Sequence, residues 1–152
     1  MNWYAVKVFY NRVASLTEWL KGQDVEIYTQ KIVPSLVFVK AEEQLIIRLR
    51  YEKYQDLFVY SDRETRVPCA IPEDQMKVFR LVTSSGEEGL EFLGDDLPKY
   101  HAGDRVRVLA GPLKGAEGHI VRIKKDRRLV VSIAGVCAVA TSFIPAPLLE
   151  KI

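Results

Sequence analysis

The chain of 152 residues is poor in the residue types from which metal sites and catalytic sites are most often built. It has two histidines and two cysteines, and the cysteines, Cys69 and Cys137, are far apart and form no CxxC pair. A zinc site needs a closely spaced set of such ligands, and a Ser/Cys–His–Asp site needs a histidine with suitable partners. We therefore expect no metal, no cofactor and no enzymatic activity. Both cysteines are expected to be buried free thiols in a reducing compartment.

Long apolar runs and a targeting segment are also missing. No run approaches the ~18 apolar residues of a membrane span. The start of the chain, MNWYAVKVFYNR, lacks the basic residues and the apolar core of a signal peptide. We expect a cytoplasmic protein without a membrane contact.

Charge is unevenly distributed, although the formal net charge is only +2. Residues 1–82 hold 12 Lys and Arg against 11 Asp and Glu, residues 86–96 hold five acids and no base, and residues 105–128 hold eight bases and two acids. An acidic, glycine-containing strip buries little apolar surface, which is typical of a linker. The sequence therefore predicts two domains, 1–84 and 99–152, joined by an acidic linker at 85–98.

Strand-like and helix-like patterns follow one another through the first domain. The run WYAVKVFY alternates and is rich in aromatic and β-branched residues, as strands are. The run IPEDQMKVFRLVTSS has helical spacing, with Pro72 in its first turn. The complete pattern has the order β-α-β-β-α-β-α. It predicts a small sheet with helices packed against it.

The second domain shows only short strand patterns, which we read as about five strands. Because no helical segment covers them, a small closed barrel is the economical arrangement. Three glycines and Pro112 lie between the first two strands, where sharp bends favour positive φ. The segment lacks the GxxxxGK[S/T] spacing of a phosphate-binding loop.

The stretch GDRVRVLAGPLKGAEGHIVRI resembles the KOW motif, which occurs in SH3-like barrels of NusG-type transcription factors and of some ribosomal proteins. The matching positions are Gly103, Asp104, Val106, Val108, Gly111, Pro112, Gly115 and Gly118.

The first domain resembles the N-terminal (NGN) domain of NusG. WYAVKVFYNRVASLTEWL is similar to its opening strand and helix, and VPCAIPEDQMKVFRLV to its last helix. KIVPSLVFVK is similar to a later strand, with Ser35 and Leu36 where Gly and Tyr are usual. The resemblance implies an α+β protein: an NGN-type small antiparallel sheet flanked by helices, then an SH3-like five-stranded β-barrel (KOW). The ending, SIAGVCAVATSFIPAPLLEKI, looks most like specialised NusG paralogues such as UpxY-type antiterminators.

This resemblance implies a transcription elongation and antitermination regulator. Its first domain would bind the clamp helices of the largest subunit of bacterial RNA polymerase through an apolar depression. The alternative for the same side chains is that they fill the core of the sheet. The candidate residues are Trp3, Tyr4, Val33, Pro34, Leu36 and Phe58.

The barrel is expected, by the same resemblance, to dock a second protein, either a small-subunit ribosomal protein or the terminator Rho. The candidate docking loop comprises Ile133, Gly135 and Val136, together with Phe143.

A basic segment, RIKKDRR, is predicted to form a hairpin in the second domain. Its charges could attract phosphate and give a weak, non-specific nucleic-acid contact, or they could simply keep the hairpin solvated. A KOW motif also leaves open the alternative of an RNA- or ribosome-binding protein. The basic residues are Arg122, Lys124, Lys125, Arg127 and Arg128.

Overall fold

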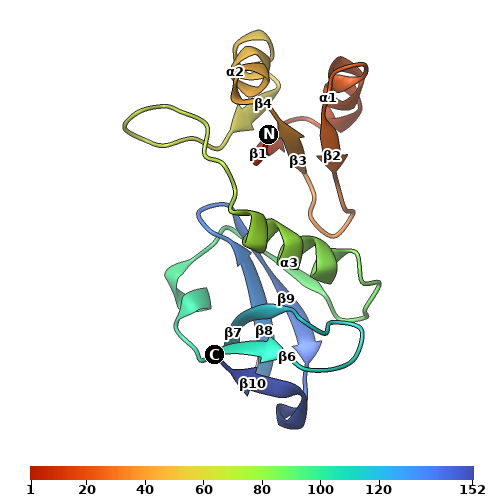
Figure 1. The fold of residues 1–152 in the computed structure, drawn as a ribbon, viewed down its shortest axis with the longest axis vertical. Helices are drawn as coiled ribbons and strands as arrows, with labels where there is room; N and C mark the ends of the chain where they lie inside the picture. The colour runs from red at the N-terminus through yellow and green to blue at the C-terminus, as the bar shows by residue number, and fades with distance from the viewer. The chain divides into compact units, whose positions relative to one another are not determined.

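The computed structural model describes all of residues 1–152, which divide into two compact units, Met1–Glu73 and Asp74–Ile152 (Figure 1). The first unit contains a four-stranded antiparallel sheet with the strand order β2-β3-β1-β4. The predicted order of strands and helices is confirmed. The elements are β1 (Asn2–Val8), α1 (Val13–Leu20), β2 (Glu26–Tyr28), β3 (Leu36–Ala41), α2 (Glu43–Glu52), β4 (Leu57–Val59) and α3 (Glu73–Thr83).

One face of this sheet packs against α1 and α2. Alternate residues of β1 and β3 supply the apolar side of the sheet, as their alternating sequence dictates. Leu16 and Leu20 of α1, one helical turn apart, and Ile46 and Leu49 of α2 supply the other side. None of the helices is long and apolar enough to cross a membrane.

The second unit contains an antiparallel sheet of six strands, in the order β10-β6-β7-β8-β9-β5. All five predicted strands are present. Helix α3, which the sequence places at the end of the first domain, falls in this unit from Asp74 onwards. The remaining elements are β5 (Glu91–Gly94), η1 (Pro98–His101), β6 (Arg105–Val108), β7 (Glu117–Ile123), β8 (Asp126–Ile133), β9 (Cys137–Phe143), η2 (Ala146–Leu148) and β10 (Leu149–Lys151).

The sixth strand, β5, comes from the acidic segment that the sequence predicts as a linker. It pairs with β9, so the sheet contains one strand more than the five expected. The acidic charge of Glu91 does not prevent pairing, because its carboxylate lies 3.6 Å from the Arg128 guanidinium and 3.4 Å from Lys124 Nζ. Ion pairs across the sheet thus stabilise a strand that composition alone assigns to solvent.

The glycines of the KOW segment serve two different purposes. Gly111 and Gly115 have φ values of 89° and 90°, as the predicted sharp bends require. Gly103 and Gly118 instead allow two backbones to approach closely. A methyl group on Gly103 would lie 1.7 Å from the carbonyl oxygen of Ile120, and one on Gly118 would lie 2.2 Å from that of Val130.

The two cysteines lie in different surroundings. Cys69 is exposed, which corrects the expectation that both thiols are buried. Cys137 is buried in β9, and this burial, reinforced by the nearby Asp96 carboxylate, raises the pKa of its thiol to about 12.

This difference predicts the thiol chemistry of the native protein. Because the thiolate is the reactive form, Ellman's reagent should modify Cys69 within minutes and leave Cys137 unmodified until the chain is unfolded in guanidinium. The Cys69→Ser variant should therefore show no rapid native reaction. A rapid reaction that persists in this variant would contradict the burial of Cys137.

Candidate protein-docking surfaces

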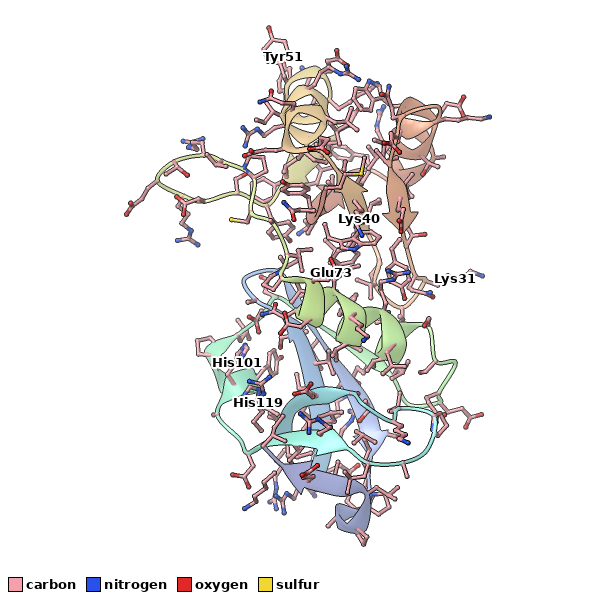
Figure 2. The ribbon with its side chains drawn as sticks, in the orientation of Figure 1. Lys31, Lys40, Tyr51, Glu73, His101 and His119 are labelled. Atoms are coloured by element: carbon pink, nitrogen blue, oxygen red, sulfur yellow. The ribbon has the colours of Figure 1, made fainter.

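The face of the first sheet opposite α1 and α2 carries a concentration of aromatic side chains. Residues that pair across antiparallel strands share a face, and the register places Leu36, Lys7 and Phe58 in one row across β3, β1 and β4. A second row contains Tyr28 of β2 and Phe38 of β3, whose ring centroids are 6.4 Å apart. Trp3 pairs with Lys40, which is labelled in Figure 2. We call the surface of Trp3, Tyr28, Leu36, Phe38 and Phe58 the aromatic face.

Three of the six residues proposed from sequence, Trp3, Leu36 and Phe58, lie on the aromatic face. Tyr4 does not, because successive side chains of a strand point to opposite faces. It belongs instead to the core beneath α1 and α2. Val33 and Pro34 lie in the turn before β3, where Val33 is buried and Pro34 is exposed.

The members of the aromatic face differ in accessibility. Trp3 and Phe38 are each 1% exposed, whereas Phe58 is 49% exposed. The Phe58 ring also packs edge-on against Tyr60, with 5.1 Å between the centroids. Sequence reasoning missed Tyr28, Phe38 and Tyr60. Alternation along each strand was the available signal, but only the register shows which positions of different strands meet.

In the second unit the proposed docking loop and Phe143 do not lie together. The loop joins β8 to β9, and Phe143 is the last residue of β9, at the other end of a seven-residue strand. This separation is about 20 Å at the usual rise per residue. Ile133 and Val136 are buried, whereas Phe143 is 61% exposed. The single docking edge expected from sequence is therefore corrected to two separate places.

The β8–β9 loop is tied to the rest of its unit through its backbone. The Ala134 N–H donates to Gln75 Oε1 at 3.0 Å, and the Gly135 N–H donates to Asp96 Oδ2 at 3.1 Å. These donors are already used inside the second unit. A partner at this loop would have to be recognised by other groups.

The basic segment forms the predicted hairpin, with Lys124 and Lys125 at its tip, both at positive φ. Arg128 has a structural role, because its side chain is 11% exposed and donates to the carbonyl oxygens of Thr141 and Gly89. Arg122 and Arg127 are exposed and pair directly across the hairpin. The charge available to a nucleic acid is therefore smaller than the sequence indicates.

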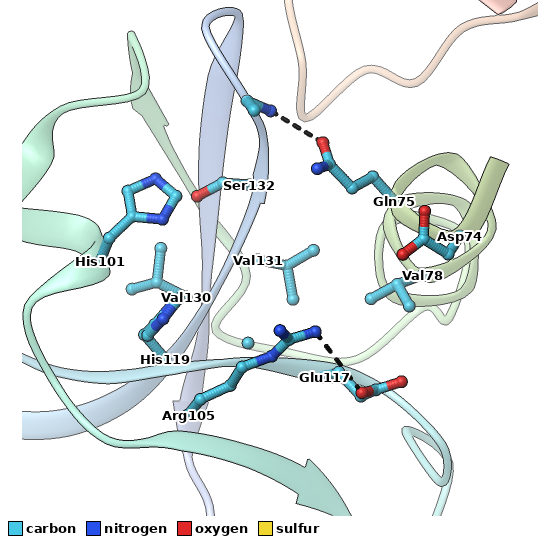
Figure 3. Close-up of a pocket in the computed structure, with 12 residues that line it drawn as sticks. Asp74, Gln75, Val78, His101, Arg105, Glu117, His119, Val130, Val131 and Ser132 are labelled. Atoms are coloured by element: carbon cyan, nitrogen blue, oxygen red, sulfur yellow. Dashed lines mark hydrogen bonds and ion pairs between the residues drawn. The ribbon is translucent and has the colours of Figure 1, made fainter. Parts of the chain in front are cut away.

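A pocket of about 260 Å³ in the second unit contains both histidines (Figure 3). His101 Nε2 lies 2.7 Å from Asp96 Oδ1, and the two imidazole rings are 5.2 Å apart. Arg105 lies across the same pocket, with its guanidinium 3.7 Å from the Glu117 carboxylate. These contacts join η1, β6 and β7. No group of three or more metal-ligating side chains is present.

Histidine 119 is expected to make the second unit less stable in acid. Burial, followed by the charges of His101 and Arg105, lowers the pKa of His119 below its ordinary value of 6.5. The folded chain then binds this proton less readily than the unfolded chain, so the free energy of unfolding falls as the pH drops through about 6.5.

We therefore expect the urea midpoint to fall between about pH 8 and about pH 5, and to fall less in the His119→Gln variant. The difference is modest because His119 is not fully buried. Identical pH profiles for the two proteins would contradict this role of His119.

Comparison with known proteins supports the two-part description. Residues 102–133 match the family model of the KOW motif. The solved structure of Thermotoga maritima NusG, described for its domain interaction, has a TM-score of 0.50 and 18% identity, and the match covers 99% of this chain and 97% of that one.

Two structures of the MjSpt4:Spt5 complex, conformations B and A, match with TM-scores of 0.36 and 0.35 and 16% identity. These matches cover 99% of this chain and 96% and 97% of those chains. No curated protein sequence matches the chain significantly. The KOW motif lies in the second unit, and the small sheet with its helices precedes it, as in NusG. The chain therefore carries a KOW motif and has the fold of a NusG-like protein.

Proposed function

We propose that this chain is a NusG-like transcription elongation factor, acting in the cytoplasm as an operon-specific antiterminator of the UpxY kind. It works by binding and has no catalytic activity of its own. The observation that carries the proposal is the combination of a KOW motif with a preceding sheet that has an aromatic face. Its accessible members, Phe58 and the partly buried Tyr28, suit a protein partner better than a small-molecule substrate.

The proposed partner of the aromatic face is RNA polymerase, at the clamp helices of its largest subunit. Phe58 is the accessible anchor of this face; in the same row Lys7 is exposed, whereas Leu36 is buried. A few apolar anchors that lose their water can dominate the affinity of an interface. A protein that binds the closed clamp better than the open one shifts the polymerase towards the processive state.

The second unit is proposed to bind another protein, a small-subunit ribosomal protein or Rho. Phe143 offers it an exposed aromatic side chain, separate from the β8–β9 loop. This arrangement would connect the polymerase to the partner through one chain.

Co-purification tests the proposed polymerase partner. The tagged full chain, mixed with purified core RNA polymerase, should retain the polymerase in a roughly equimolar complex on an affinity column. Polymerase retained no better than by an empty column would count against the proposal.

One observation favours a second candidate function, RNA binding. Arg122 and Arg127 face each other across the hairpin and Lys125 lies beside them at the tip, which gathers charge at one end of the second unit. This candidate predicts RNA affinity that decreases steeply with salt. It also predicts that the Arg122→Gln/Arg127→Gln variant binds RNA more weakly than the wild type. On this candidate function, the wild-type chain does not retain polymerase on the affinity column.

A further inference from the structure

A hollow of about 430 Å³ lies in the first unit, beside the end of α2, β4 and the loop of residues 61–66 that extends past them (Figure 1). Tyr54 and Phe58 contribute aromatic residues to its lining, and Leu57 and Val59 of β4 border it while their side chains belong to the core beneath α1 and α2. Three arginines line the rest of it. We call this hollow the arginine–aromatic pocket, and its arginines are Arg50, Arg63 and Arg66.

The loop that carries two of these arginines is held in one conformation by its own hydrogen bonds. Asp62 Oδ1 accepts the N–H groups of Glu64 and Thr65 at 2.9 and 2.8 Å, and these bonds lower the pKa of Asp62. Arg50 Nη1 donates to the Arg66 carbonyl oxygen at 2.6 Å and so joins the loop to α2. The pocket is therefore formed before any partner arrives, which reduces the entropy lost on binding.

The positive charge of the pocket is not neutralised by the protein. Arg63 and Arg66 take part in none of the ion pairs of the structure. Arg50 donates only to uncharged oxygens, those of Ser61 and Arg66. Asp62 is the only acidic residue of the lining, so a single carboxylate stands against three guanidinium groups. Two guanidinium groups are thus available to an anionic partner.

Apolar surface is exposed at the same place. Tyr54 is 67% exposed and Phe58 is 49% exposed, and both line the hollow. A hollow lined by aromatic rings accepts an apolar side chain, and guanidinium groups bind carboxylates in a bidentate manner. A hollow of this size accepts one apolar side chain beside the arginines, which favours an acidic peptide. A nucleic acid strand, which would stack its bases on the two exposed rings, is the competing occupant.

We propose that the arginine–aromatic pocket docks an acidic peptide segment of a partner protein. An apolar or aromatic side chain of the segment enters between Tyr54 and Phe58, and flanking carboxylates bind Arg63 and Arg66. This site adjoins the proposed polymerase contact of the aromatic face and shares Phe58 with it, whereas Tyr54, Arg63 and Arg66 belong to the pocket alone. Its test needs no polymerase, so the two proposals can fail independently.

Fluorescence anisotropy of the full chain with a labelled peptide of Asp and Glu residues around one Phe tests the proposal. Arg63→Gln/Arg66→Gln should weaken binding about tenfold or more, because two charge-assisted contacts are lost while both positions stay exposed. Tyr54→Ser should weaken it about fivefold by removing one apolar contact. Lys21→Gln/Lys31→Gln, which removes the same charge from exposed positions elsewhere in the first unit, should bind as the wild type does.

Two further probes decide between the possible occupants. A peptide with Ser in place of Phe should bind the wild type more weakly, and a labelled oligothymidylate should bind less well than the Phe peptide at equal salt. The proposal is overturned if the wild type does not bind the Phe peptide or if the arginine variant binds it unchanged. Equal binding of the Ser peptide, or tighter arginine-dependent binding of the oligonucleotide, overturns it as well.

Discussion

Replacing Gly103 with alanine is expected to destabilise the second unit by about 3 kcal/mol, at the upper end of the usual cost of overpacking. The added methyl group would lie 1.7 Å from the carbonyl oxygen of Ile120, and backbone cannot move aside as a flexible side chain can. The Ile120 N–H donates to the Asp104 carbonyl oxygen at 2.9 Å, so a shift that relieves the clash also disturbs the entry into β6.

The exposure of Cys137 measures this effect in the second unit. In a Cys69→Ser background, Cys137 is the only thiol, and its reaction with Ellman's reagent in increasing urea reports the opening of the sheet that contains β9. The Gly103→Ala chain should expose Cys137 at a much lower urea concentration than the parent. The matched control is Gly111→Ala.

The Gly111 position has a positive φ of 89° but no atom within 4 Å of an added methyl group. Its replacement should cost only about 1 kcal/mol, the usual cost of a left-handed alanine. Equal losses at the two positions would show that backbone conformation, rather than close approach, explains both glycines.

Replacing Phe58 with aspartate is expected to weaken binding to core RNA polymerase about 30-fold or more, the loss typical of an anchor residue. Phe58 is half exposed, so its loss should leave the first unit folded, and the new charge would have to be desolvated in the interface. Titration of labelled polymerase with the full-length variant measures the change.

Tyr51→Asp provides the matched control for this experiment. Tyr51 is 83% exposed and projects from the end of α2, the helix that covers the opposite face of the sheet (Figure 2). Because Tyr51 lies outside the proposed contact, Tyr51→Asp should bind polymerase with the affinity of the wild type. If both variants bind as the wild type does, the aromatic face is not the polymerase contact.

Local patterns were sufficient to predict the three α-helices and every strand except β5. Alternation and helical spacing are properties of adjacent residues, so the order β-α-β-β-α-β-α and the five strands after it could be read directly. The KOW segment was predictable for the same reason, since its bends depend on residues such as Gly111 and Gly115. Gly103 was matched to the motif, but the reason why glycine is needed there could not be predicted. It is the close approach of the Ile120 backbone, which only the fold brings near.

Features that depend on contacts between residues far apart in the sequence were missed or assigned to the wrong place. Strand β5 pairs with β9 and packs Leu93 against Val130 and Ala140, while Glu91 meets Arg128 and Lys124, and an acidic run shows none of these contacts. Trp3 and Tyr4 were assigned to one surface, although strand alternation separates them. Phe38 was overlooked because its place beside Tyr28 follows from register alone.

Single-round transcription by bacterial RNA polymerase on a template with a terminator tests the proposed regulatory role most directly. With the full-length chain present, the fraction of transcripts that pass the terminator should rise with protein concentration and saturate, and Phe58→Asp should shift this response to higher concentration. An unchanged readthrough fraction at saturating protein, on a template of the operon that encodes the chain, would contradict the account.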